Sequence, residues 1–383
     1  MSKAMLGAWC AVVLVASAAV LVASATAVHH DSSKTTSGAR AAASSDASSD
    51  ASTTSTLPPS PPRLLFSARS INEATATTHS IDLSGTDERP EALAPVQLGQ
   101  VSPDGKRVVL DKGNSRQFSN CGFAGCSTTN TLSGDIVIAD RDGSNEQPVT
   151  HGGYNRGARW SSRDVIAFVA HVEDANHIEH DEIELIRASG VLVGVVPPQD
   201  QTAPEDPEFS PDGNQLAYVL ASTQDASRTL HVYDLVATTD RELAAGAFSG
   251  LHWSPDGTQL VGVRPHTRDW PNPDELVVVP VNGDPLRVVY QADSRPPSAQ
   301  HYVCGGSQEG YAQLADPIWS PDGASIAFLH NLEHIDFDGA VLDVAVIAAD
   351  GSNLHTVRST ARTECTGPNG SRSYETLQLL GWA

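Results

Sequence analysis

The chain has 383 residues, of which 40% are hydrophobic and 18% charged, so it can form a packed core and is not disordered throughout. Its 24 Lys and Arg face 46 Asp and Glu, which gives a formal net charge of −22. This charge argues against nucleic-acid binding and against electrostatic docking on anionic lipid, because both need a basic surface. It fits simple solubility, a cationic partner or bound cations.

Residues 1–28 are typical of an export signal. Lys3 precedes an apolar run from Met5 to Val28 that ends in small residues. A run of this length also spans a bilayer, so an uncleaved signal anchor stays open. In both cases we expect the rest of the chain to be extracytoplasmic: secreted, periplasmic or anchored to the cell envelope.

Residues 29–62 are rich in Ser, Thr, Ala and Pro and contain no aromatic residue. Such a segment cannot bury enough apolar surface to offset the entropy lost on ordering. We therefore expect a flexible, disordered tether between the signal and a folded domain over residues 63–383.

One turn sequence recurs in the folded domain at intervals of 44 to 66 residues. It is Ser-Pro-Asp-Gly, starting at Ser102, Ser210, Ser254 and Ser320, with a degenerate copy at Ser161. Pro and Gly suit the second and fourth positions of a type I turn, and the Ser side chain can bond back to the turn. Each copy precedes a run rich in β-formers, so each predicts a β-hairpin.

Every copy of the turn is followed by a second hairpin signal. Examples are Asp142-Gly143 and Asp350-Gly351, each preceded by an apolar run. Periods in this range indicate a radial or stacked array. The pattern predicts an all-β chain of four-stranded antiparallel blades, with a Trp or another apolar residue before each turn Ser acting as a wedge between blades.

The two ends of the domain complement each other. The unit that begins at Leu64-Leu65-Phe66 lacks its first strand, and the segment Thr376–Trp382 is an apolar strand that stops where a Ser-Pro-Asp-Gly turn would follow. Pairing of these segments would close six blades into a ring and hide the open sheet edges. We predict a six-bladed β-propeller closed by its C-terminal strand.

The combination of Trp-Ser-Pro-Asp-Gly, a strand and a hairpin at Asp-Gly-Ser-Asn resembles the WD-like propeller repeat of the TolB family. The resemblance covers residues 63–383 and implies the six-bladed fold. The TolB propeller follows an α/β domain, and we expect only the predicted tether in that place here. Propeller peptidases carry a hydrolase domain as well, and this chain has no Gly-x-Ser-x-Gly motif for one.

Long segments connect the predicted hairpins on one face of the ring, which we call the long-loop face. They are expected over 112–134, 171–181, 265–274, 293–314, 331–339 and 359–375. Loops of this length usually carry function or disorder, so we expect this face to bind the partner.

Four cysteines outside the signal fall in these segments. An even number in an exported chain predicts disulfides, here Cys121–Cys126 and Cys304–Cys365. Free or metal-bound thiols are the alternative.

Polar side chains on the long-loop face are the candidate contacts for a ligand or partner. The histidines lie among carboxylates, a mixture that suits Zn or, for the carboxylates alone, Ca; solvated loops are the alternative. Asp206 and Asp316 precede Pro, three residues before the aromatic residue of an innermost strand, which places them at the rim of the central tunnel, unless they only form turns. The full set is Asp206, Asp316, His171, His177, His266, Trp270, His301, His330 and His334.

Two functions remain open. The first is a monomeric, non-enzymatic propeller that binds a protein or peptide through the long-loop face and needs no cofactor. The second is a lactonase-like propeller hydrolase or a lyase, with a metal ion at the tunnel mouth held by His and Asp residues of the set above. Elemental analysis would separate them.

Overall fold

The computed structural model describes residues 62–70, 75–96, 100–122, 125–225, 227–265, 274–292, 313–331, 342–360, 364–366, 371–373 and 375–383. For 113–122, 125–133, 313, 331, 364–366 and 371–373 it describes the backbone alone. The chain divides into two units, residues 1–58 and 59–383, and everything described here belongs to the second, which is compact. The predicted signal and most of the predicted tether lie outside the described residues. The described part of the chain contains no helix of the length and apolarity that membrane crossing requires.

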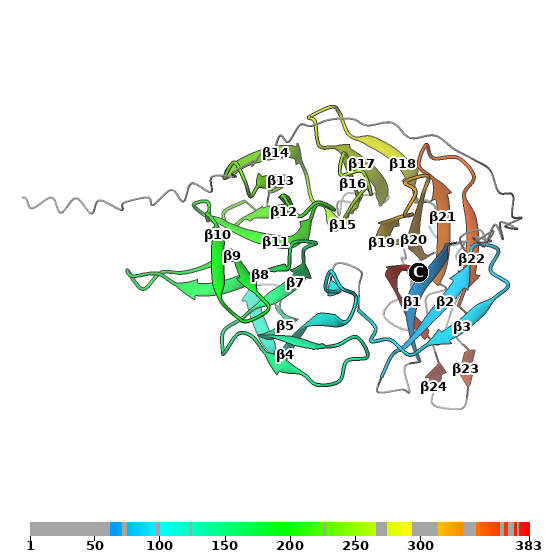
Figure 1. Cartoon of the computed structure of the whole chain (residues 1–383), viewed down its shortest axis with the longest axis horizontal. Helices are drawn as coiled ribbons and strands as arrows, with labels where there is room; N and C mark the ends of the chain where they lie inside the picture. The colour runs from blue at the N-terminus through cyan, green and yellow to red at the C-terminus, as the bar shows by residue number, and fades with distance from the viewer. Residues whose placement is uncertain are drawn as a thin grey trace, which may run out of the picture. The chain divides into compact units, whose positions relative to one another are not determined.

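The second unit is a six-bladed β-propeller, as the repeats predict (Figure 1). Its sheets follow one another around a ring, and the strands in each are antiparallel neighbours. From the inside outward, the strands of blade 1 are β25 (Glu375–Trp382), β1 (Arg63–Ser70), β2 (Thr77–Asp82) and β3 (Glu88–Glu91). Those of blade 3 are β7 (Arg156–Trp160), β8 (Val165–Glu173), β9 (Glu179–Arg187) and β10 (Leu192–Val196).

The next three blades repeat this order. Blade 4 consists of β11 (Thr202–Phe209), β12 (Gln215–Ser222), β13 (Arg228–Asp234) and β14 (Thr239–Ala245). Blade 5 consists of β15 (Ser249–Trp253), β16 (Gln259–Arg264), β17 (Glu275–Pro280) and β18 (Arg287–Gln291). Blade 6 consists of β19 (Gln313–Trp319), β20 (Ser325–Asn331), β21 (Leu342–Ala348) and β22 (His355–Ser359). The short strands β23 (Glu364–Thr366) and β24 (Ser371–Ser373) pair between blades 6 and 1.

Blade 2 is the least regular. Its paired strands are β4 (Arg107–Gly122), β5 (Gly125–Asp140) and β6 (Gln147–Pro148), and its innermost strand is reduced to a single bridge between Val101 and Val108. The segment 112–134, which the sequence predicts to be a loop, instead continues the β4–β5 ladder as far as Gly122 and Gly125. Antiparallel pairing satisfies the backbone hydrogen bonds of this segment, which a loop would leave to water.

The C-terminal strand closes the ring. β25 pairs antiparallel with β1 from Leu64–Trp382 to Ser70–Glu375, and the backbones of Arg63 and Ala383 exchange hydrogen bonds of 3.1 and 2.8 Å. The closure predicted from the sequence is therefore confirmed. It removes the two open edges that a linear array of blades would expose.

The recurring turn sequence builds the same structure in each blade that carries it. In blade 4, Ser210 Oγ donates to Asp212 and accepts from the Gln215 N–H at 2.9 Å, while the Gly213 N–H donates to the Ser210 carbonyl. Gly213 has a φ of +67°, and this conformation has no steric cost for glycine because glycine has no Cβ. In the degenerate copy Asp164 occupies this left-handed position.

The aromatic residue before each turn packs between its own blade and the preceding one. Trp253 belongs to the apolar cluster of blades 4 and 5, Trp319 to that of blades 5 and 6, and Trp382 to that of blades 6 and 1. The core is therefore a set of seams between neighbouring blades, and the centre of the ring is left for the innermost strands to line.

Candidate functional site

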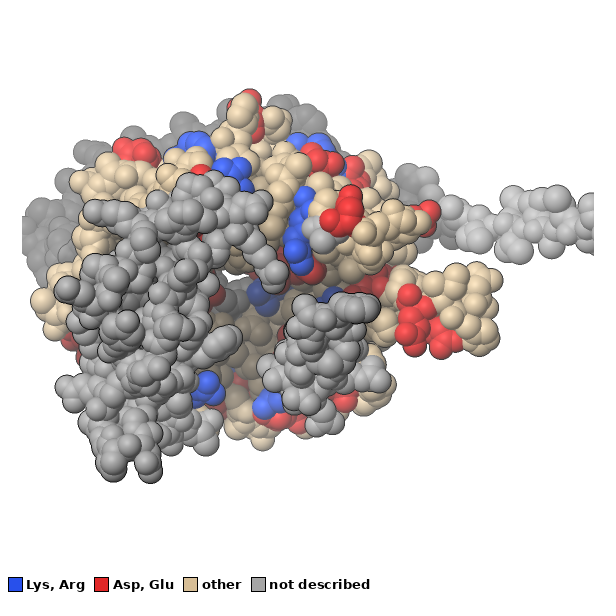
Figure 2. All heavy atoms as spheres, turned by 180° about the vertical axis from the view of Figure 1, so that it is seen from behind, with Lys and Arg blue, Asp and Glu red and all other residues tan. Residues whose placement is uncertain are grey.

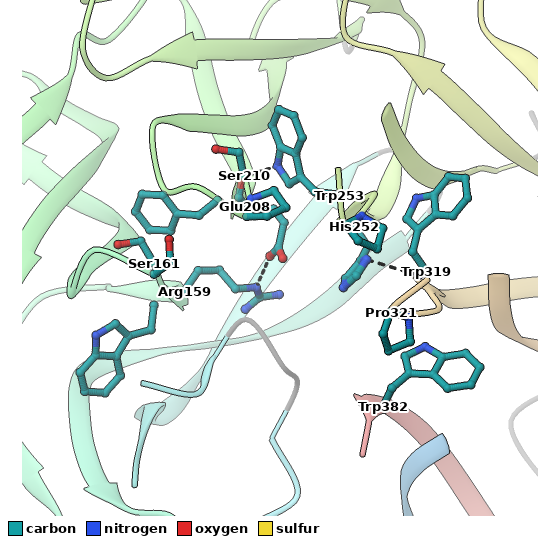
Figure 3. A pocket seen from close by; sticks show the side chains of 14 residues that line it. Arg159, Ser161, Glu208, Ser210, His252, Trp253, Trp319, Pro321 and Trp382 are labelled. Carbon is teal, nitrogen blue, oxygen red and sulfur yellow. Dashed lines mark hydrogen bonds and ion pairs between the residues drawn. The ribbon is translucent and has the colours of Figure 1, made fainter. Parts of the chain in front are cut away.

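The central channel is lined by the residue that directly precedes each wedge aromatic. Side chains alternate along a strand, so when the aromatic points into a seam its neighbour points toward the ring axis. In blades 3, 4 and 5 these neighbours are Arg159, Glu208 and His252 (Figure 3). Three consecutive blades thus place a cation, an anion and an imidazole around the same channel.

A β-bulge two residues before each of these channel-lining positions changes the path of the innermost strand. The ladder register shifts in blades 3 to 6, and the residue three positions before the aromatic is left-handed in each: Gly157 at φ +68°, Asp206 at +50°, Gly250 at +60° and Asp316 at +48°. Left-handed backbone is uncommon for Asp and costs free energy, so it points to a local requirement. At Gly250 the requirement is space, because a Cβ there would lie 2.9 Å from Pro317 Cδ.

Two cavities along the channel have Arg159, Glu208 and His252 as common lining residues. The cavity toward the Ser-Pro-Asp-Gly turns has a volume of about 390 Å³ and is walled by Trp and Pro side chains (Figure 3). The other, of about 200 Å³, is lined by Asp206 and Asp316 as well. Both carboxylates that the sequence placed at the tunnel rim therefore face one small space.

Charges in the channel are partly compensated. Arg159 Nε donates to Glu208 Oε2 at 2.9 Å, although burial raises the pKa of Glu208 above its usual value. Burial also lowers the pKa of His252 to about 4. A neutral imidazole at pH 7 agrees with its contact, since Nδ1 of His252 accepts the Trp319 backbone N–H at 3.3 Å.

The two aspartates of the bulges carry the remaining negative charge. Asp206 has an accessible side chain because the channel is hollow, yet protein surrounds it, and this desolvation raises the pKa of its carboxyl despite the nearby Arg159. Burial likewise raises the pKa of Asp316 to about 6, while a 3.3 Å hydrogen bond from the Leu379 N–H opposes the shift. Perturbed acids in a cavity are a feature of functional sites.

A larger cavity lies on the long-loop face, between blades 3 and 4. Its volume is about 950 Å³, and it is bounded by the β8–β9 hairpin on one side and, on the other, by residues 198–203, which comprise the crossover into blade 4 and the start of β11. We call it the seam cavity. The base of its blade 3 wall is an ion-paired group, in which Asp181 accepts from Arg156 Nη2 and binds His171 Nδ1, both at 2.7 Å. Burial alone would raise the pKa of Asp181, but these two partners hold it below its usual value.

The tip of the β8–β9 hairpin is held by its own side chains. Asp174 Oδ1 accepts the N–H groups of Asn176 and Ile178, at 2.8 and 2.9 Å, and His177 bonds to Glu173. Ile178 remains 59% exposed at the cavity. Figure 2 shows acidic side chains gathered on the hairpin that projects at the right of the view.

The other predicted site residues fall into two groups. His330 is buried in the seam of blades 5 and 6, where it packs edge-on against Tyr290 at 5.4 Å, and burial lowers its pKa. His266, Trp270, His301 and His334 lie outside the described residues. Within the residues that are described, no group of three or more His, Cys, Asp and Glu is arranged to hold a metal ion.

The structure describes three of the four cysteines of the predicted disulfides. Cys121 and Cys126 are direct cross-strand partners near the tip of the β4–β5 hairpin, a separation that a disulfide can bridge. Cys365 pairs with Arg372 between β23 and β24, and Cys304 lies outside the described residues.

The channel residues Arg159, Glu208 and His252 are absent from the sequence-based candidates. Their signal was present: each directly precedes the aromatic of a turn copy, and strand alternation places that position opposite the wedge. The wall of the seam cavity formed by 198–203 had no comparable signal, because it depends on how two blades meet.

Comparisons with known proteins find similar solved structures at low identity and no related sequence family. No protein-family model and no curated sequence matches the chain. Similar solved structures include a protein assigned as TolB from Agrobacterium tumefaciens, at 16% identity over 83% of this chain and 98% of that one, with a TM-score of 0.48. They also include TolB from Acinetobacter baumannii, at 14% identity over 84% and 66% with a TM-score of 0.48. Oligogalacturonate lyase from Vibrio parahaemolyticus is similar at 13% identity over 66% and 68%, with a TM-score of 0.40.

Proposed function

We propose that this protein is an exported, non-enzymatic propeller scaffold that binds a protein or peptide partner through its long-loop face. The observation that carries the proposal is the seam cavity, about 950 Å³ of space open on that face between blades 3 and 4. Sites that enclose small ligands are usually preformed hollows of roughly 300–1,000 Å³, a range that includes this cavity. The export signal and tether would place such a scaffold outside the cytoplasm, free to meet a partner.

The walls of the seam cavity are fixed before any partner arrives. The crossover is attached to blade 4 because Thr223 donates to the Gln201 carbonyl from both its N–H, at 2.9 Å, and its Oγ1, at 3.0 Å. Gln199 Nε2 reaches Asp240 at 2.9 Å. A surface that is already ordered loses little entropy on binding, which favours specific recognition.

A substitution that fills the cavity tests the proposal. Ala203 lines the seam cavity, and Ala203→Trp places a bulky side chain there. The matched control is Ala237→Trp, in the exposed β13–β14 turn of the same blade but on the opposite face. We expect Ala203→Trp to abolish partner capture from an envelope fraction and Ala237→Trp to retain it, with both variants melting like the wild type. Equal capture by the two variants would contradict the proposal.

The second candidate is a hydrolase or lyase in the channel. The observation that favours it is the convergence of Asp206 and Asp316, both with raised pKa values, on one cavity of about 200 Å³. Elemental analysis of the purified protein decides between the two. A tightly held metal in stoichiometric amount would favour the enzyme, and the absence of both metal and any thermal shift with Ca or Zn would favour the scaffold.

A further inference from the structure

The seam cavity has an asymmetric charge. Five carboxylates line it, and Arg156 is the one Lys or Arg among its lining residues. The acidic residues are Asp174, Glu179, Asp181, Asp200 and Glu205. Arg156 Nη2 forms an ion pair with Asp181 at 2.7 Å, so its charge does not neutralise the other four carboxylates.

The other four acidic residues differ in how much of their negative charge is compensated by neighbouring groups. Arg228, from the start of β13, binds Glu205 through Nε at 3.1 Å. Asp174 accepts hydrogen bonds from its own turn, which stabilise its charged form and lower its pKa. Glu179 lies 3.6 Å from His171 Nε2, while Nδ1 of the same ring binds Asp181. Asp200 has no ion pair with any residue that the structure describes.

Glu179 and Asp200 stand on the two sides of the cavity. Glu179 begins β9 in the hairpin wall and has a side chain that is 72% exposed, while Asp200 lies in the exposed crossover wall. A positive group entering between these walls meets negative charge from both. In bulk water each such contact is weak, but a partly enclosed space screens it less.

Apolar surface in the cavity suits a long aliphatic side chain. Tyr154 presents an aromatic ring, held edge-on to His171 at 5.8 Å, and Ile178 and Pro198 line the space as well. Lys and Arg side chains bury their methylene stems along such surface while the charged head meets carboxylate or an aromatic face. Charge and apolar lining therefore select the same kind of group.

We propose that the seam cavity receives a Lys- or Arg-bearing segment of the partner, with Glu179 and Asp200 contacting its positive charge. This inference rests on the proposed function and specifies the partner's chemistry. A basic, extended peptide segment fits a cavity that is open on this face and complements a chain with a net charge of −22.

The test uses the full-length protein and a fluorescently labelled tetra-lysine peptide, with tetra-glutamate and Gly-Ser peptides as comparisons. Fluorescence anisotropy measures binding to the wild type and to the double variant Glu179→Gln, Asp200→Asn. The matched control is Glu242→Gln, Asp284→Asn, which removes the same two charges from exposed positions in blades 4 and 5. Both pairs make the net charge less negative by two, so a general field effect would act on both alike.

We expect tetra-lysine to bind the wild type more tightly than the other two peptides and to lose affinity about tenfold in the cavity variant, as two partly exposed ion pairs would imply. The control variant should bind as the wild type does, and added salt should weaken binding. Equal losses in both double variants, or no preference for tetra-lysine, would overturn the inference.

Partner capture by the two variants tests the proposed function separately from this inference. If Ala203→Trp abolishes partner capture while the Glu179→Gln, Asp200→Asn variant still captures the partner fully, the scaffold function stands and the basic segment is refuted. If Ala203→Trp captures the partner normally, the proposed function fails, whatever the peptide does.

Discussion

Removal of residues 376–383 would delete the innermost strand of blade 1. This strand joins the two ends of the folded domain, and it contributes four buried apolar side chains, three of them in the closing seam. Leu379 is fully buried, and Leu377, Leu380 and Trp382 are 8%, 3% and 9% exposed. Leu377, Leu379 and Trp382 belong to the apolar cluster shared by blades 6 and 1.

The expected loss follows from these burials. A fully buried large apolar side chain contributes about 1.5–3 kcal/mol, so four of them contribute on the order of 6–12 kcal/mol. Native proteins are stable by about 5–15 kcal/mol in total. The truncation also leaves the inner edge of β1 unpaired. We therefore expect the truncated protein to lose its cooperative transition or to aggregate.

A point substitution measures the same effect in a protein that still folds. Leu379→Ala should cost about 2–5 kcal/mol, because it leaves a cavity in the closing seam. Gln378→Ala is the matched control in the same strand, since Gln378 is exposed and surface changes stay within about 0.5 kcal/mol.

Urea unfolding followed by Trp fluorescence provides the measurement. Deletion of residues 31–60, the predicted tether, should leave the transition unchanged. The reasoning is refuted if the protein lacking 376–383 unfolds like the full-length protein, or if Leu379→Ala and Gln378→Ala share one midpoint.

Three further predictions concern the seam, the channel and the cysteines. Arg358 of β22 binds Glu375 through two 3.0 Å hydrogen bonds and Glu88 through a third. Arg358→Met should therefore lower the free energy of unfolding by about 2 kcal/mol. An unchanged urea midpoint would argue against a stabilising role for these ion pairs. The pKa of Asp316 is about 6 in the folded protein against an ordinary 3.8, so the folded state binds more protons than the unfolded chain between these values, and stability falls as the pH rises from about 4 to 6. Asp316→Asn should remove up to about 3 kcal/mol of this pH-dependent loss, less where channel water solvates the carboxylate, and parallel pH profiles of the two proteins would disprove the assignment. Alkylation and intact-mass analysis of the exported chain should find no free thiol, with Cys121–Cys126 and Cys304–Cys365 bridged; the second bridge would contribute about 4 kcal/mol, and four free thiols would rule both out.

Short stretches of sequence determine much of the architecture. The Ser-Pro-Asp-Gly turns form through contacts within six residues, such as that between Ser210 and Gln215, so their structure follows from the turn residues themselves. Counting hairpins and noting the missing first strand of blade 1 was enough to predict six blades and closure by Thr376–Trp382, because an unpaired inner strand would be costly.

The sites depended on the tertiary structure. Arg159 and Glu208 lie 49 residues apart and meet only because consecutive innermost strands face one axis. The seam cavity lies between a hairpin of blade 3 and the chain segment that enters blade 4, so it depends on how two blades meet, to which no local residue pattern corresponds. His330 was interpreted as a surface ligand because the residues after it are polar, yet it lies in β20 on the same face as Phe328 and packs in the seam against Tyr290. Turn chemistry and strand alternation act between near neighbours in the chain, whereas cavities and charge pairs are produced by the packing of distant segments.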